Sequence, residues 1–216
     1  MAAVRERIAR AAERARRDPA DILLLAVTKV FPADVIREAY DLGMREFGEN
    51  YVQEFEGKAP LVADLAGARF HLIGHLQSNK AKKAAELFQV VQTVDSAKLA
   101  RRLNEAVTAP LDVMLEVKLS PEEAKAGADP AGLAELIADV KACPNLRLLG
   151  LMTMPPWSED PEAPRPYFRK LRELAQEHGL AQLSMGMSHD LETAIEEGAT
   201  CVRVGTALFG KRKKPA

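Results

Sequence analysis

The chain has 216 residues, 47% of them apolar and 28% charged, and its 30 basic and 31 acidic side chains give a formal net charge of −1. This balance excludes a protein that binds polyanions or membranes through its overall charge. Two cysteines are too few for a disulfide framework, and no apolar run approaches the roughly 20 residues of a membrane span. Because the N-terminus also lacks the apolar stretch of a secretory signal, we expect one cytoplasmic globular domain, residues 1–216.

Short apolar segments alternate with helical patterns along the whole chain. The first helical pattern has apolar residues at Val4, Ile8, Ala12 and Ala15 and ends before Pro19. A continuous apolar run follows at 22–27, which is typical of a strand buried on both faces. Further strand-like segments appear at 45–48, 69–73, 90–94, 111–117, 146–152, 182–187 and 200–204.

Capping and turn residues mark where helices begin and end between these strands. Ser96 and Asp129 precede apolar helical stripes and predict N-caps. Gly43, Gly179 and Gly198 follow such stripes, as expected of residues just beyond a helix.

Eight strands separated by helices predict an α/β fold with a parallel sheet and right-handed crossovers. We interpret the pattern as a closed (β/α)₈ TIM barrel. An open doubly wound sheet is the alternative, and the absence of G-x-G-x-x-G after the first strand weakens a dinucleotide-binding version of it.

Polar residues gather where the barrel would place its chemistry, at the C-terminal ends of the strands. Lys29 follows the uncharged residues 22–28, so it is either a lysine that emerges into solvent or a partly desolvated amine that attacks carbonyl groups. The loops after the last two strands carry Ser188, Gly205 and Thr206, whose hydroxyl and backbone N–H groups suit a phosphate. The alternative role of Ser188 is to cap the following helix. A reactive lysine beside a phosphate site favours a sugar-phosphate aldolase or a pyridoxal phosphate (PLP) protein.

Six segments in the same order as in a known family span nearly the whole chain. They resemble the PLP homeostasis proteins, whose PLP-binding barrel is similar to the N-terminal domain of alanine racemase. The matching segments are residues 26–30, 47–54, 70–80, 150–154, 183–188 and 202–210.

The resemblance implies a PLP site with a role for each matching residue. Lys29 would hold PLP as an internal aldimine, and Ser188, Gly205 and Thr206 would bind its phosphate. Arg203 would face the pyridine nitrogen, and Asn50 would lie beside the ring or its phenolic oxygen. Lys118 stands where the family more often has asparagine, so no family role is carried over to it.

Arg203 interrupts the apolar segment 201–208, so its charge needs a partner, either the pyridine nitrogen or an acidic neighbour. An arginine at the ring nitrogen disfavours its protonation and weakens the ring as an electron sink. The resembling racemases also use a tyrosine from a second domain, which we do not expect here. Tyr51, His75 and His189 are possible replacements. Each also has a structural interpretation, as a helix packing residue, a loop histidine and a first-turn surface residue.

We therefore expect a PLP-binding protein of intracellular PLP (vitamin B6) homeostasis, without robust catalysis and without a metal. Amino acids or apo PLP enzymes would take PLP from it, and the chain would be monomeric. A PLP-dependent amino acid racemase is the alternative. A nucleic-acid-binding protein is a third, based on basic residues at 80–83 and 211–214, but no aromatic stacking platform accompanies them, so we expect no nucleic acid or membrane partner.

Overall fold

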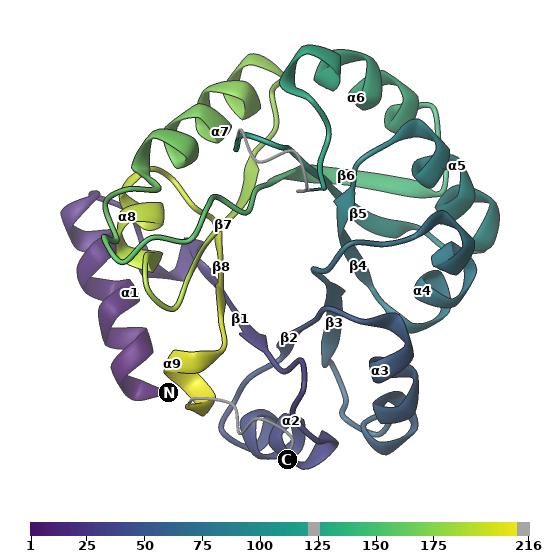
Figure 1. Cartoon of the computed structure of the whole chain (residues 1–216). Helices are drawn as coiled ribbons and strands as arrows, with labels where there is room; N and C mark the ends of the chain where they lie inside the picture. Colours follow the sequence, from purple (N-terminus) through teal and green to yellow (C-terminus); the bar gives the residue numbers. More distant parts are fainter. Residues whose placement is uncertain (121–125, 211–216) are drawn as a thin grey trace.

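Eight parallel strands form a closed barrel in the computed structural model, which describes residues 1–120 and 126–210 (Figure 1). Neighbours in the chain are neighbours in the sheet, and the first strand pairs with the last, with Leu25 opposite Arg203. This pairing confirms the predicted barrel and excludes the open sheet. The strands are β1 (Leu23–Val27), β2 (Glu46–Glu49), β3 (Arg69–Leu72), β4 (Val90–Val94), β5 (Leu111–Glu116), β6 (Leu146–Met152), β7 (Gln182–Met187) and β8 (Cys201–Val204).

Helices surround the barrel and begin and end at the residues that local chemistry favours. Ser96 accepts a hydrogen bond from the N–H of Leu99, at 3.4 Å. The prediction that Asp129 caps the apolar helix is wrong, because Asp129 caps the short 3₁₀-helix Pro130–Gly132 through the N–H of Ala131, at 2.8 Å, and Gly132 is the N-cap of α6. Gly43 follows its helix with a φ of 91°, a conformation that costs glycine little. The α-helices are α1 (Ala2–Arg14), α2 (Ala33–Asp41), α3 (Val52–Lys58), α4 (Ala81–Leu87), α5 (Ala97–Ala106), α6 (Leu133–Lys141), α7 (Arg165–Glu177), α8 (Leu191–Glu196) and α9 (Thr206–Phe209).

The apolar residues form two separate clusters, one outside and one inside the barrel. Most of them pack between the strands and the helices, whereas Leu25, Val27, Ile73 and Cys201 form a small cluster of their own. Because side chains alternate between the two faces of a strand, Leu25 and Val27 share a face, and Lys29 continues the same alternation beyond the end of β1. The expectation that 22–27 is buried throughout is wrong at Leu23, which is 37% exposed at the N-terminal mouth.

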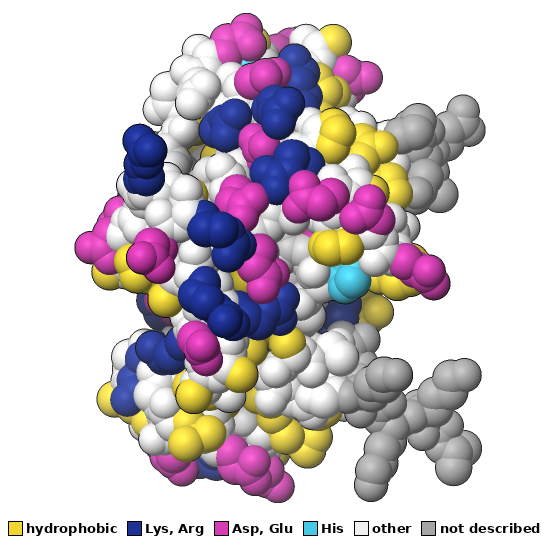
Figure 2. Space-filling view, turned by 90° about the vertical axis from the view of Figure 1, so that its left-hand side faces the viewer, with side chains coloured by type: hydrophobic (Ala, Val, Ile, Leu, Met, Phe, Trp, Pro, Cys, Tyr) yellow, Lys and Arg dark blue, Asp and Glu magenta, His cyan; other side chains and the backbone are white. Residues whose placement is uncertain are grey.

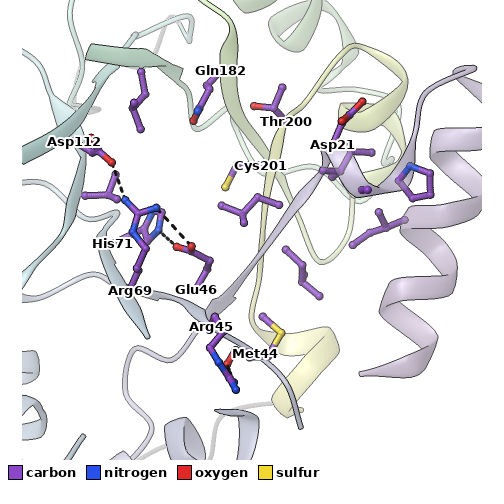
Figure 3. Close-up of a pocket in the computed structure, with 18 of the residues that line it drawn as sticks. Asp21, Met44, Arg45, Glu46, Arg69, His71, Asp112, Gln182, Thr200 and Cys201 are labelled. Carbon is purple, nitrogen blue, oxygen red and sulfur yellow. Dashed lines mark hydrogen bonds and ion pairs between the residues drawn. The ribbon is translucent and has the colours of Figure 1, made fainter. Parts of the chain in front are cut away.

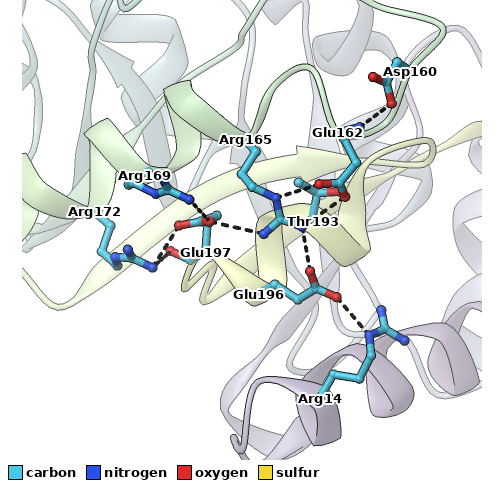
Figure 4. A network of polar contacts seen from close by, with 9 residues as sticks. All are labelled: Arg14, Asp160, Glu162, Arg165, Arg169, Arg172, Thr193, Glu196 and Glu197. Carbon is cyan, nitrogen blue, oxygen red and sulfur yellow. Dashed lines mark hydrogen bonds and ion pairs between the residues drawn. The ribbon is translucent and has the colours of Figure 1, made fainter.

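Ion pairs bind three helices to one another on one side of the barrel. Arg165 of α7 pairs with Glu196 of α8 at 2.7 Å, and Glu196 also pairs with Arg14 of α1 at 2.9 Å (Figure 4). Figure 2 shows the same side of the molecule, where basic and acidic side chains are interspersed. The basic segment 211–214 lies outside the described residues.

No helix in the described part of the chain is long and apolar enough to cross a membrane. This agrees with the short apolar runs of the sequence.

Candidate functional site

One cavity of about 680 Å³ at the C-terminal mouth of the barrel brings together all the predicted site residues. They come from four strand ends that are far apart in the sequence, those of β1, β2, β7 and β8. The six residues are Lys29, Asn50, Ser188, Arg203, Gly205 and Thr206. Sequence reasoning had not assigned the loop that follows β6, which adds Met154, Pro156, Trp157 and Ser158 to the cavity wall.

The backbone on both sides of Lys29 is held by side chains of α3. On one side, Lys58 donates a hydrogen bond from Nζ to the carbonyl oxygen of Thr28, at 3.1 Å. On the other side, the N–H of Val30 donates to Glu54 Oε1, at 2.6 Å, and Val30 has a φ of 70°, which β-branched residues rarely adopt. The backbone of Lys29, which is itself half-buried, is thus fixed where its side chain leaves the strand.

Lys58 also forms an ion pair with a fully buried carboxylate, that of Glu49. Lys58 Nζ lies 3.0 Å from Glu49 Oε1, which also accepts a hydrogen bond from the Thr28 hydroxyl at 2.8 Å. Burial raises the pKa of Glu49, and the Lys58 charge opposes this rise. Sequence reasoning missed this cluster, although Glu54 and Lys58 are spaced as an i, i+4 ion pair on a helix.

Arg203 is buried in the barrel, and protein groups hold its guanidinium. Nη1 donates to Ser184 Oγ at 2.8 Å, and Nη2 donates to the carbonyl oxygen of Thr153 at 2.9 Å. Burial lowers the pKa of Arg203, and the charges of Asp190 and Glu116 oppose this effect. The predicted need for a partner is therefore met in part by neutral acceptors and in part by nearby carboxylates.

Glu116 lines a second cavity of about 530 Å³ that adjoins the first, since Met154 borders both. Its carboxyl group is buried, and within the described residues its Oε2 has no hydrogen-bond partner. Burial raises the pKa of Glu116 to about 7, against the opposing effect of the Arg203 charge. Lys118, the position that departs from the family, and His75 line this second cavity.

The loops after β7 and β8 meet through Ser188. Its Oγ accepts a hydrogen bond from the N–H of Ala207, at 3.2 Å, in the first turn of α9. The alternative role of Ser188 as the cap of the next helix is wrong, because Asp190 occupies the N-cap of α8. Gly205 leaves room above β1, where an added Cβ would lie 3.4 Å from the carbonyl oxygen of Val27. The two loops thus bring the hydroxyl groups of Ser188 and Thr206 and the first residues of α9 to the cavity.

The three residues considered as acid–base groups lie in different places. His189 lines the main cavity, and its Nε2 lies 2.8 Å from the carbonyl oxygen of Glu159. His75 lines the second cavity, while Tyr51 is 55% exposed at the start of α3.

Comparison with known proteins identifies close relatives over nearly the full chain. The family model for the N-terminal domain of alanine racemase matches residues 1–213. The pyridoxal phosphate homeostasis protein of Pseudomonas aeruginosa is 51% identical, with 98% of this chain and 94% of that protein covered. The protein of the same name from Aquifex aeolicus is 46% identical, with 99% of this chain and 97% of that protein covered.

Solved structures show the same barrel. PipY of Synechococcus elongatus, solved with PLP bound, is 40% identical and superimposes with a TM-score of 0.84 over 94% of this chain and 100% of that chain. Alanine racemase of Bacillus anthracis has a TM-score of 0.67 at 16% identity over 98% of this chain and 56% of that chain, a likeness of fold alone.

Proposed function

Because the chain belongs to the alanine racemase N-terminal domain family, and within it to the pyridoxal phosphate homeostasis proteins, we propose that it binds PLP and acts in PLP homeostasis. The observation that carries the proposal is the convergence of six polar or small residues from four strand ends in one cavity. The PLP-bound relative PipY supports it, since that protein has the same fold at 40% identity.

The residues that line the cavity fit the chemical groups of PLP. Lys29 would bind the aldehyde carbon covalently through Nζ, and Ser188, Gly205 and Thr206 would hold the phosphate. The Asn50 side chain supplies a further test of fit, because its Oδ1 is buried without a hydrogen-bond partner among the described residues. A bound ligand with a polar ring substituent would satisfy this amide, which can offer either an acceptor or a donor.

Arg203 would face the ring nitrogen and set the electronic character of the site. PLP supplies an aldehyde for amines and a ring that acts as an electron sink when its nitrogen is protonated. A guanidinium at that nitrogen disfavours the proton, so Arg203 makes the site better suited to holding the cofactor than to carbanion chemistry. We therefore propose a binding protein without robust catalysis.

The mouth of the cavity suits exchange of the cofactor with other molecules. Trp157 and Met154, which border it, are 73% and 39% exposed. An incoming amine from an amino acid or an apo PLP enzyme would therefore reach Lys29 without opening a lid. We propose that the protein works as a cytoplasmic monomer that gives up PLP to such amines.

Two assays on the purified protein loaded with PLP test this function. The protein should restore activity to an apo PLP enzyme, and long incubation with amino acids should produce no racemisation by chiral analysis. The control is Lys29→Ala at the same total PLP, which separates transfer from the effect of dissolved cofactor. Turnover that disappears in Lys29→Ala would favour the racemase, and no binding of PLP at all would refute the proposal.

A further inference from the structure

Five side chains inside the barrel form an unbroken hydrogen-bonded chain that begins at Arg203. Arg203 Nη1 lies 2.8 Å from Ser184 Oγ, which lies 2.6 Å from Gln92 Oε1. Gln92 Nε2 lies 2.9 Å from His71 Nδ1, and His71 Nε2 lies 2.5 Å from Glu46 Oε2. We call these residues the barrel chain. It crosses from β8 to β2 through β7, β4 and β3.

The chemistry of its members gives the barrel chain one direction. A guanidinium only donates, so the Ser184 oxygen accepts from Arg203. The Ser184 hydroxyl in turn donates to Gln92 Oε1. The Gln92 amide must then turn its NH₂ group toward His71. His71 Nδ1 therefore accepts, its proton lies on Nε2, and Nε2–H donates to the Glu46 carboxylate. In this arrangement all four bonds run from Arg203 toward Glu46.

The far end of the barrel chain lies at the opposite mouth of the barrel. Glu46 and His71 line a cavity of about 1070 Å³ there, together with Arg69 and Asp112 (Figure 3). Arg69 pairs with Asp112 at 2.7 Å and lies 3.7 Å from Glu46, and Arg147 also pairs with Asp112, at 2.6 Å. The Glu46 carboxylate, which ends the barrel chain, thus lies beside the ion pair of Arg69 with Asp112.

We propose that Gln92 and His71 are positioning residues, which act through Ser184 to hold the Arg203 guanidinium toward the cofactor cavity. This inference rests on the proposed function, since it concerns the residue that would face the PLP ring nitrogen. Ser184 and Gln92 are fully buried, so no water replaces a lost hydrogen-bond partner. Removal of one member therefore changes the orientation of the next, and through Ser184 that of Arg203. The Gln92 amide could turn either its oxygen or its NH₂ group toward Ser184. The barrel chain selects the orientation in which the oxygen accepts from the Ser184 hydroxyl.

A measurement on the wild-type protein without PLP tests the direction of the barrel chain. The ¹⁵N shifts of the His71 ring report where protons lie, and we expect a proton on Nε2 and none on Nδ1, which accepts from Gln92. A proton on Nδ1 would reverse the Gln92 amide and overturn the proposal. This arm needs neither a variant nor the cofactor, so its outcome is independent of whether PLP binds.

Paired substitutions test the effect on Arg203. Asn at position 71 keeps an acceptor near the place of Nδ1, whereas Leu removes it, so His71→Asn should retain PLP affinity and His71→Leu should lose it. The expected loss is about tenfold in the PLP dissociation constant, the factor that one lost buried hydrogen bond produces. Gln92→Met, which keeps the volume and removes the amide, should match His71→Leu.

The absorbance spectrum of bound PLP distinguishes positioning from general destabilisation. His71→Leu and Gln92→Met should shift it in the same direction as Arg203→Lys does, while the matched control Asp21→Asn, an exposed residue from the same cavity as His71, should leave it unchanged. Equal spectra and affinities in the wild type, His71→Leu and Gln92→Met would refute the positioning role. If the wild type binds no PLP, the proposed function fails, and the arginine side-chain NMR signals of the same variants still decide whether the barrel chain orders Arg203.

Discussion

Replacement of Glu116 by glutamine should stabilise the protein at neutral and alkaline pH. Burial raises the pKa of this carboxyl from 4.5 to about 7, so the folded chain holds the proton more tightly than the unfolded chain does. The contribution of Glu116 to stability therefore falls as the pH rises from 4.5 to about 7 and is constant above that range. Each pKa unit corresponds to about 1.4 kcal/mol, which gives a total loss of about 3 kcal/mol. Glutamine keeps the shape of the side chain and removes the charge that causes this loss.

The assay is urea unfolding of Glu116→Gln and the parent protein between pH 4 and pH 9. Circular dichroism is the suitable probe, because the single tryptophan, Trp157, is 73% exposed and reports poorly on the core. The two proteins should be equally stable at pH 4, and the variant should be more stable by up to about 3 kcal/mol at pH 8. Glu177→Gln, on the exposed surface of α7, should follow the parent at every pH.

One result would refute this reasoning. A variant less stable than the parent above pH 7 would show that attraction between Glu116 and Arg203 outweighs the cost of burying the carboxylate. Glu116 would then be the counter-ion of Arg203 rather than a group that is neutral over much of the physiological range.

Three further predictions concern the cavity and its support. Lys29→Ala should fold with a Tm within about 2 °C of the parent, as expected for a half-buried side chain at a strand end, and borohydride reduction followed by peptide mapping should no longer recover a pyridoxyl label at position 29. Ser188→Ala and Thr206→Val should weaken PLP binding more than pyridoxal binding, since only PLP has a phosphate, and equal losses in a titration would contradict their role. Lys58→Met should lower the free energy of unfolding by about 3 kcal/mol in urea because it leaves Glu49 buried and unpaired, and a change below about 1 kcal/mol would show that Glu49 is neutral.

The barrel could be predicted from sequence because its signals are local. The segments 90–94, 146–152 and 182–187 have the same bounds in the structure as in the prediction, and the other strands differ by one residue at one or both ends. Strands buried on both faces appear as continuous apolar runs, and the helices between them carry their own caps. The known placement of chemistry in such barrels then selects the strand ends that meet in the cavity.

The supporting residues could not be predicted in the same way. When both faces of a strand are buried, apolar periodicity does not distinguish the inside of the barrel from the outside. Gln92 and Ser184 therefore gave no signal, although they bond to each other across 92 residues of sequence. Ser188 and Asp190 are both favourable capping residues, and the sequence offers no means to decide which of the two begins α8.

The polar side chains inside this barrel are better explained by function than by stability. A buried arginine costs stability unless every donor is satisfied, and apolar residues of similar volume often stabilise a protein at least as well. Arg203 is nevertheless buried, and Ser184, Gln92 and His71 occupy interior positions that apolar side chains could fill. Under the proposed function this arrangement has a use, because a guanidinium that donates to Ser184 and Thr153 would keep its charge directed at the ligand in the cavity. Stability alone therefore does not explain why an arginine occupies position 203 inside the barrel.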